Sequence, residues 1–230
     1  MPISESTASR MDEALEVLGS VPLIDGHNDW PHLIRGFYDN RLDERFDLDK
    51  NLVGHVDMNR LLQGKSGGAF WSVYVDCPES DDFNDNAAHF EIIRDTMQQI
   101  DLVHRLVRLY KKHMGLVRRA SDIMALHREG RFASLIGVEG LHQIGNSPSI
   151  LRLYHKLGVR FRLTSQTATI PAHDGLSVYG RNMVREMNRI GMIIDLSHTS
   201  EAVMRQTLDQ SAAPVIFSHS STFVWLSLGI

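Results

Sequence analysis

In the segment Pro22-Leu23-Ile24-Asp25-Gly26-His27-Asn28-Asp29-Trp30-Pro31, a short apolar run ends in polar residues. His27 and Asp29 stand two positions apart, and on a strand that spacing places both side chains on one face. An imidazole nitrogen and a carboxylate oxygen directed at one point are ligands that zinc accepts. One such pair is weak support for a metal site, because isolated strand-end histidines usually bond the backbone. A metal site here therefore requires further ligands from later parts of the chain.

The composition favours a globular protein that acts on a small molecule. The 230 residues are 43% hydrophobic, which is enough for one large core and excludes a disordered polymer. The formal net charge of -4 comes with no basic footprint for nucleic acid and no run of like charges for a membrane surface. Cys77 is the only cysteine, so neither an intrachain disulfide nor a thiolate metal site is expected, and a small buried filler is its usual role.

The N-terminal residues carry no visible export signal. Residues 1–10 are polar, and no apolar core of signal-peptide length follows them. Nowhere does the chain reach the roughly 18 apolar residues that a membrane span needs. The sequence therefore predicts a cytoplasmic protein without a membrane span.

Apolar runs with the residue bias of strands alternate with helical patterns along the chain. Six strands are expected, over Leu23–His27, Ala69–Asp76, Phe132–Gly140, Val159–Thr164, Met192–His198 and Pro214–His219. Helical periodicity is found between them, most clearly over about residues 84–112. Residues 30–68 are expected to form a long loop with short helices. This alternation predicts a parallel sheet with helices outside it, in a single domain over residues 1–230.

Polar residues at the strand ends distinguish between the two common parallel architectures. A doubly wound open sheet usually carries a glycine-rich phosphate turn, and no Gly-x-Gly-x-x-Gly follows the first strand. In a barrel, groups at the carboxyl ends of several strands converge on one centre. Four of the six expected strands end in such groups, namely His27, Asp29, Glu139, His198 and His219. The sequence therefore favours an α/β fold of the TIM-like (β/α) barrel type, incomplete because about six of its eight strands are counted.

Each of these five residues also has an ordinary structural explanation. A strand-end histidine can bond the backbone, and Glu139 beside Gly140 can cap a helix or lie on the surface. Taken together, histidines or carboxylates that close four strands after apolar runs favour a metal centre over coincidence.

Four motifs carry a resemblance to a known family. The chain resembles the membrane (renal-type) dipeptidase family of zinc peptidases in Asp25–Pro31, Gly137–Gly140, Ile194–Ser200 and Ile216–Ser221. The motifs occur in the family's order, and the resemblance extends from about Leu23 to Ser221.

The resemblance implies a hydrolase with two zinc ions at the mouth of a (β/α) barrel, where a metal-activated hydroxide cleaves the peptide bond of dipeptides. Glu139 would bridge the two ions and serve as the catalytic carboxylate. His27 and Asp29 would complete one zinc site, and His198 and His219 the other. The implied partner is a dipeptide substrate, with no nucleic acid and no membrane span, and a homodimer is left open as the assembly.

The sequence departs from the family on the substrate side. Relatives carry a histidine in a Leu-Thr-His context after the fourth strand, where this chain has Leu163-Thr164-Ser165. Ser165 is therefore the expected counterpart of a substrate-binding histidine. The family continues for a further third, which supplies an arginine and an acidic residue, and Thr222 to Ile230 match neither. We therefore expect a truncated domain that lacks its C-terminal third.

Two alternatives to a dipeptidase stay open at this point. One is another metal-dependent amidohydrolase, acting on cyclic amides or lactones. The other is a non-catalytic metal-binding fragment.

Overall fold

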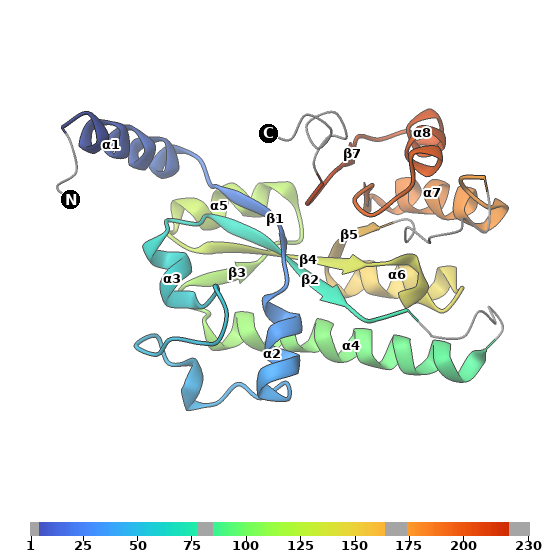
Figure 1. Ribbon diagram of the computed structural model, residues 1–230, viewed down its shortest axis with the longest axis horizontal. Coiled ribbons are helices and arrows are strands. Elements are labelled where there is room, and N and C mark those ends of the chain that lie inside the picture. Colours follow the sequence, from blue (N-terminus) through green and yellow to red (C-terminus); the bar gives the residue numbers. More distant parts are fainter. Residues whose placement is uncertain (1–4, 78–84, 164–173, 221–230) are drawn as a thin grey trace, which may run out of the picture. The chain divides into compact units, whose positions relative to one another are not determined.

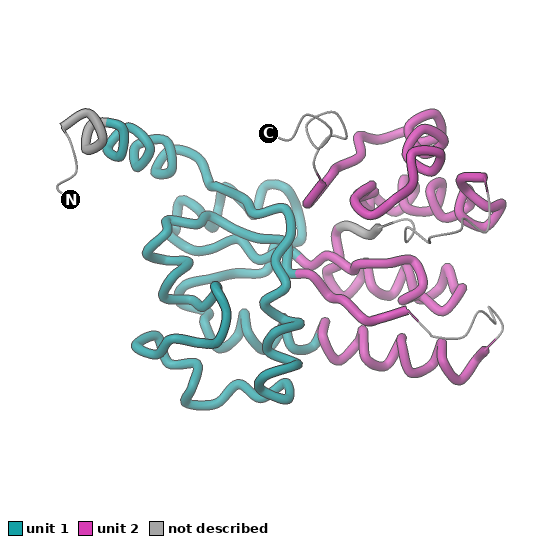
Figure 2. Tube along the Cα trace, in the orientation of Figure 1, with its two compact units in different colours: residues 1–71, 101–135 teal, residues 72–100, 136–230 magenta. Residues whose placement is uncertain are grey.

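A computed structural model describes residues 5–77, 85–163 and 174–220 (Figure 1). The chain divides into two compact units, residues 1–71 with 101–135 and residues 72–100 with 136–230 (Figure 2). Three elements run from one unit into the other: strand β2 (Gly68–Tyr74), helix α4 (Asn86–Leu109) and strand β4 (Phe132–Glu139).

The first unit contains the elements that precede β2 and those between α4 and β4. They are α1 (Glu5–Ser20), β1 (Ile24–Asn28), α2 (Trp30–Tyr38), the short 3-10 helix η1 (Glu44–Phe46), α3 (Met58–Gln63), β3 (Met114–Leu116) and α5 (Ala120–Arg128). Its strands are parallel: β1 pairs with β2, and β3 pairs with β4.

The start of β2 also lies close to β4. Ala133 N donates a hydrogen bond to Gly67 O at 2.8 Å. A Cβ added at Gly68 would lie 2.6 Å from Ala133 O, a distance that real Cβ atoms do not reach. Glycine at this position is therefore what allows the backbones of the two strands to approach.

Aromatic side chains form the interior of the first unit. Trp30 and Trp71 are 1% and 0% exposed, and their ring centroids lie 5.5 Å apart. Trp71 stacks on Phe132 at 5.3 Å, and Trp30 on Tyr110 at 6.3 Å. Because buried aromatic rings remove large areas of apolar surface from water, this cluster fixes the segment around the end of β1.

The second unit repeats a strand and helix alternation after β4. Its further elements are the 3-10 helix η2 (Leu141–Ile144), α6 (Pro148–Leu157), β5 (Val159–Leu163), α7 (Val178–Ile190), β6 (Ile193–Asp195), α8 (Glu201–Gln210) and β7 (Val215–Ile216). The strand order β4-β5-β6-β7 is parallel throughout, with Ile136 paired to Val159 and Asp195 to Ile216.

Helix ends in the second unit follow capping rules. Gly158 and Gly191 adopt left-handed conformations just past α6 and α7, where a Cβ would be strained. Ser200 accepts a hydrogen bond from Val203 N and so caps α8. The two glycines therefore end α6 and α7, and Ser200 begins α8.

The structure confirms the α/β alternation and the parallel sheet, with two corrections of detail. The described residues form seven strands rather than six, because Met114–Leu116 forms β3. Three residues are too few to show a strand period in sequence. Strands β6 and β7 end earlier than expected, at Asp195 and Ile216. None of the described helices is long and apolar enough to cross a membrane.

Candidate metal centre

His27 and Asp29 come together in the first unit, although Asp29 lies just past the strand on which the sequence analysis placed it. His27 Nε2 lies 3.3 Å from Asp29 Oδ1, and the two side chains are 9% and 50% exposed. Asp29 stands just past β1, at the N-cap of α2, and its side chain caps no helix N–H. The carboxylate is instead directed at the imidazole, so the pair presents one nitrogen and one oxygen donor.

Asp25 shapes the turn that carries this pair. Its carboxylate accepts hydrogen bonds from His27 N at 3.0 Å and from Asn28 Nδ2 at 2.9 Å. Asn28 Oδ1 in turn accepts from Trp30 N at 3.1 Å, which joins the turn to a buried side chain. Such side-chain bonds to the local backbone hold the end of β1 in one conformation.

Glu139, His198 and His219 come together in the second unit. Glu139 Oε1 lies 3.5 Å from His198 Nε2 and 3.9 Å from His219 Nε2. The two Nε2 atoms are 2.7 Å apart. Three donor atoms from three different segments therefore face one another at the carboxyl ends of β4, β6 and β7.

The position of Glu139 is fixed by a hydrogen bond to its carboxylate and by the backbone turn that follows it. Ser72, which is 1% exposed, donates from Oγ to Glu139 Oε2 at 2.9 Å. Gly140 then turns the chain at φ 117°, and a Cβ there would lie 2.3 Å from the His142 ring. Any other residue at Gly140 would both strain the backbone and displace that ring.

The segment after Glu139 is tied down by buried polar contacts. Gln143, 0% exposed, donates from Nε2 to Val73 O at 3.1 Å and to Thr96 Oγ1 at 2.9 Å. Tyr154 donates its hydroxyl to Gln143 O at 2.9 Å. Because these hydrogen bonds are shielded from water, they hold η2 against β2, α4 and α6.

Both histidines lie in turns beyond their strands rather than on them. His198 has a left-handed φ of 59°, three residues past the end of β6. Asp195, at that strand end, accepts from Ser197 N at 3.0 Å and from Ser218 N at 3.1 Å. One buried carboxylate therefore organises both histidine-bearing turns, and this is the reason the strands stop early.

Three residues of this arrangement were missed in the sequence: Ser72, Asp195 and Ser218. Asp195 carried a usable signal, since it closes an apolar run as Glu139 does. Ser72 carried none, because its partner Glu139 is 67 positions away.

The donor sets within each unit fit a borderline metal ion. Imidazole nitrogens with carboxylate oxygens are the ligands of zinc and related ions, and no thiolate is needed. The residues of both sets could therefore hold a metal cofactor. Ser165, the expected substrate-binding position, lies outside the described residues.

Cys77 does not compete as a nucleophile. Burial, with a smaller contribution from Asp76, raises the pKa of the Cys77 thiol to about 11. The thiol therefore stays protonated at neutral pH.

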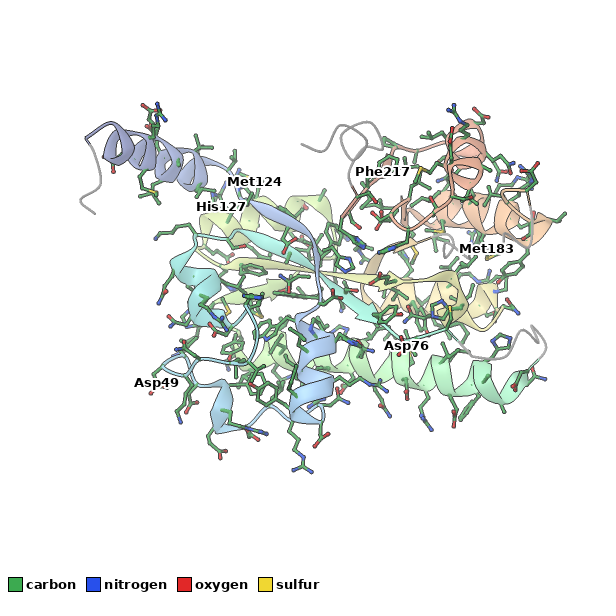
Figure 3. The ribbon with its side chains drawn as sticks, viewed as in Figure 1. Asp49, Asp76, Met124, His127, Met183 and Phe217 are labelled. Carbon is green, nitrogen blue, oxygen red and sulfur yellow. The ribbon has the colours of Figure 1, made fainter. Side chains whose placement is uncertain are left out.

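Burial also raises the pKa of Tyr74 to about 12, helped by the hydrogen bond that its hydroxyl donates to Asp76, labelled in Figure 3. Tyr74 therefore acts as a hydrogen-bond donor at neutral pH.

Relatives of high identity cover nearly all of this chain. It is 48% identical over 244 residues to dipeptidase tcpJ of Claviceps purpurea (strain 20.1), covering 93% of this chain and 57% of the relative. It is 49% identical over 223 residues to dipeptidase verJ of Clonostachys rogersoniana, covering 92% of this chain and 57% of the relative. The chain thus spans less than two thirds of the length of these relatives.

The fold is similar to that of a metallo peptidase from Rhodobacter sphaeroides, whose crystal structure contains a phosphinate mimic of the dipeptide L-Ala-D-Ala. The TM-score is 0.73 at 24% identity, covering 87% of this chain and 65% of the other. This likeness confirms the TIM-barrel-like α/β class. The family model described as membrane dipeptidase (peptidase family M19) matches residues 11–224. Because that match extends over most of its length, the chain belongs to the membrane dipeptidase family, peptidase family M19.

Proposed function

We propose that this chain hydrolyses the peptide bond of dipeptides at a centre of two zinc ions. The observation that carries the proposal is the position of Glu139, whose Oε1 faces two histidine nitrogens while Ser72 holds its Oε2. With zinc bound, Glu139 would be the ligand that the two ions share. Membership of the membrane dipeptidase family supplies the reaction class.

The proposal gives each donor pair one ion. His27 and Asp29 would complete one zinc site with Glu139, and His198 and His219 would complete the other. When bound, a pair of zinc ions supplies a hydroxide nucleophile at neutral pH and polarises the scissile carbonyl. Within this proposal, residues 1–230 act as one dipeptidase-like hydrolase domain.

The side chains themselves contribute charge balance and orientation. As metal ligands, Glu139 and Asp29 would bring two negative charges, and the three histidines would ligate through neutral imidazole rings. His27 is the more enclosed ligand and Asp29 the more solvated one, at 9% and 50% exposure. We therefore expect the Asp29 side of the pair to face water and substrate.

Two relatives named as dipeptidases support a dipeptide as the substrate class. The related bacterial metallo peptidase holds a dipeptide mimic with a D-residue, so mixed L,D-dipeptides belong in any substrate screen. Ser165 is part of the proposal as the substrate-binding counterpart of the family histidine. A serine hydroxyl is shorter and uncharged, so it would stabilise a tetrahedral oxyanion less well.

A test of Ser165 uses the single change Ser165→His. If the histidine restores an oxyanion donor, kcat rises by about a hundredfold with KM little changed. An unchanged kcat in a chain extended to the family's length would show that the serine is no catalytic deficit.

The test of the function is a metal-content measurement joined to a hydrolysis screen. Purified chain is analysed for bound metal, loaded with zinc, and assayed against L,L- and L,D-dipeptides, cyclic amides and lactones. Zinc with dipeptide turnover supports the proposal, and turnover of only the cyclic substrates indicates a different amidohydrolase. Zinc without any turnover indicates a non-catalytic metal-binding fragment. Light scattering on the same sample tests whether the chain is a homodimer.

A further inference from the structure

Asp195 is a buried carboxylate that the proposed reaction does not use. It closes β6 and is 0% exposed. Its Oδ1 accepts two backbone hydrogen bonds, from Ser197 N at 3.0 Å and Ser218 N at 3.1 Å. Its Oδ2 accepts a hydrogen bond from the Ser218 hydroxyl. Both oxygens of Asp195 are therefore directed at the two turns that carry His198 and His219.

Ser218 links this carboxylate to the His219 ring. Ser218 Oγ lies 2.7 Å from His219 Nδ1 as well as within hydrogen-bond distance of Asp195 Oδ2. A hydroxyl has one proton to donate, and a carboxylate can only accept. Because Ser218 donates its proton to Asp195, Nδ1 of His219 must carry the proton shared with Ser218 Oγ.

We propose that Asp195 and Ser218 are positioning residues that fix His219 as its Nδ1–H tautomer. The ring is then left with its lone pair on Nε2, the atom that lies 3.9 Å from Glu139 Oε1. The reason for fixing this tautomer rests on the proposed function, because only a metal ligand needs the lone pair on Nε2. The tautomer itself follows from the hydrogen bonds alone.

Ser197 joins this hydrogen-bond network and does not change the direction in which Ser218 donates. Its Oγ accepts from His219 N at 3.1 Å and lies 3.2 Å from Ser218 Oγ. Ser218 Oγ has already donated its proton, so the Ser197 hydroxyl is the donor in that contact. The contacts of Ser218 Oγ with Asp195, His219 and Ser197 are therefore all compatible with one direction of proton donation.

The tautomer of His219 also determines that of His198. His198 Nε2 and His219 Nε2 are 2.7 Å apart, so one nitrogen must donate and the other accept. With the His219 Nε2 unprotonated, His198 carries the proton on its own Nε2. Without metal, the two histidines thus take opposite tautomers, and a bound cation would replace that shared proton.

Asp195→Asn is the most informative substitution. The two backbone N–H donors hold an oxygen at the Oδ1 position, so the new amide nitrogen takes the place of Oδ2 and donates to Ser218. Ser218 is then free to donate its own proton to His219 Nδ1. The relay reverses, His219 becomes the Nε2–H tautomer, and its ligand lone pair is lost with almost no change in shape.

The direct experiment is long-range ¹H–¹⁵N correlation NMR on metal-free, histidine-labelled chain at about pH 8.5, where an ordinary imidazole is neutral. We expect His219 as the Nδ1–H tautomer and His198 as the Nε2–H tautomer in the wild type. Asp195→Asn should convert His219 to Nε2–H, whereas Ser218→Thr, which keeps the hydroxyl, should not. A wild-type His219 protonated on Nε2, or a tautomer unchanged by Asp195→Asn, would overturn the inference. The wild-type spectrum decides even if the variant does not fold.

A zinc titration against a chromophoric chelator then separates this inference from the proposed function. Losing the orienting partner of a ligand costs about 10–100-fold in metal affinity, and we expect that loss for Asp195→Asn but not for Ser218→Thr. Ser211→Ala is the control, because its hydroxyl contacts Asn188 and Ala213 in the same unit. A wild type that binds no zinc contradicts the proposed function while the NMR result stands. Zinc binding with equal affinity in wild type and Asp195→Asn contradicts the positioning role.

Discussion

The two units hold their candidate ligands by different physical means. In the first, His27 and Asp29 follow each other along a single turn, which local hydrogen bonds to Asp25 hold beside a buried aromatic cluster that includes Trp30 and Trp71. In the second, the ligands come from three separate segments that hydrogen bonds to Ser72 and Asp195 hold in place. The hydrogen bonds of the first unit join residues that are neighbours along the chain, whereas those of the second unit join segments that are distant in sequence and that no local chain connection holds together. The second set of ligands should therefore be the more sensitive to single polar substitutions.

The largest effect is expected from Glu139→Gln. The amide keeps the size of the side chain but removes the charge that would lie between two cations. We expect loss of both metal ions and a fall in dipeptide turnover of about a thousandfold or more, since metal activation is worth several kcal/mol.

The matched control for this change is Glu186→Gln, which makes the same substitution at a glutamate that pairs with Arg152 and Arg189. Its metal content and turnover should equal those of the wild type. Comparable turnover in both variants would contradict the role of Glu139 as a metal ligand.

Truncation of Trp71 tests the aromatic side of the comparison. Trp71 is 0% exposed and packs against Trp30 and Phe132, so Trp71→Ala should lower the free energy of unfolding by about 3–5 kcal/mol. Urea denaturation followed by circular dichroism measures the change.

Trp71→Phe is the control for ring packing. The indole N–H of Trp71 is buried and finds no acceptor within the described part of the chain. Phenylalanine therefore keeps an aromatic ring and removes no hydrogen bond, and its loss of stability should be clearly smaller. Equal losses of unfolding free energy in both variants would contradict a stabilising role of ring stacking in this unit.

Much of this arrangement could be predicted from the sequence. The five candidate ligands stood out because each follows an apolar run, and the structure brings His27 close to Asp29 and Glu139 close to His198 and His219. The strand β3 was missed because Met114–Leu116 is too short to show a period. The orienting hydrogen bonds were missed because they join distant positions, such as Ser72 to Glu139 and Asp195 to Ser218. A periodic pattern of apolar residues indicates which face of a helix or strand a residue occupies, but it does not indicate the hydrogen-bond partners of polar atoms.

Ser72→Ala tests the hydrogen-bonded side with a smaller change. Removal of the hydroxyl leaves Glu139 Oε2 without the donor at 2.9 Å, so the carboxylate loses part of its orientation. We expect metal affinity to fall about 10–100-fold in a chelator competition. Ser134→Ala is the control, since Ser134 is as buried as Ser72 but its hydroxyl lies 3.8 Å from the Met114 sulfur, away from Glu139. Equal affinities for the two variants would contradict a role for Ser72.

The smallest effect is expected for the pH dependence of stability at Glu186, near the surface of the second unit. Hydrogen bonds from Arg189, then from Arg152, lower the pKa of Glu186 from 4.5 to about 2. A depressed folded-state pKa means that the stabilisation is present above about pH 4.5 and is lost as the pH falls towards 2. Because both arginines are well exposed, the contribution stays below about 1 kcal/mol. The difference in unfolding free energy between wild type and Glu186→Gln should therefore shrink over that range, and a constant difference would contradict the assignment.

The most direct test of the central claim is zinc stoichiometry, measured by equilibrium dialysis for wild type, His27→Ala and His219→Ala. If the two ligand groups each hold one ion and share Glu139, the wild type binds about two zinc ions and each variant about one. Circular dichroism establishes that each sample is folded. A folded wild-type chain that takes up no zinc, or two variants that bind as much zinc as the wild type, would contradict the account.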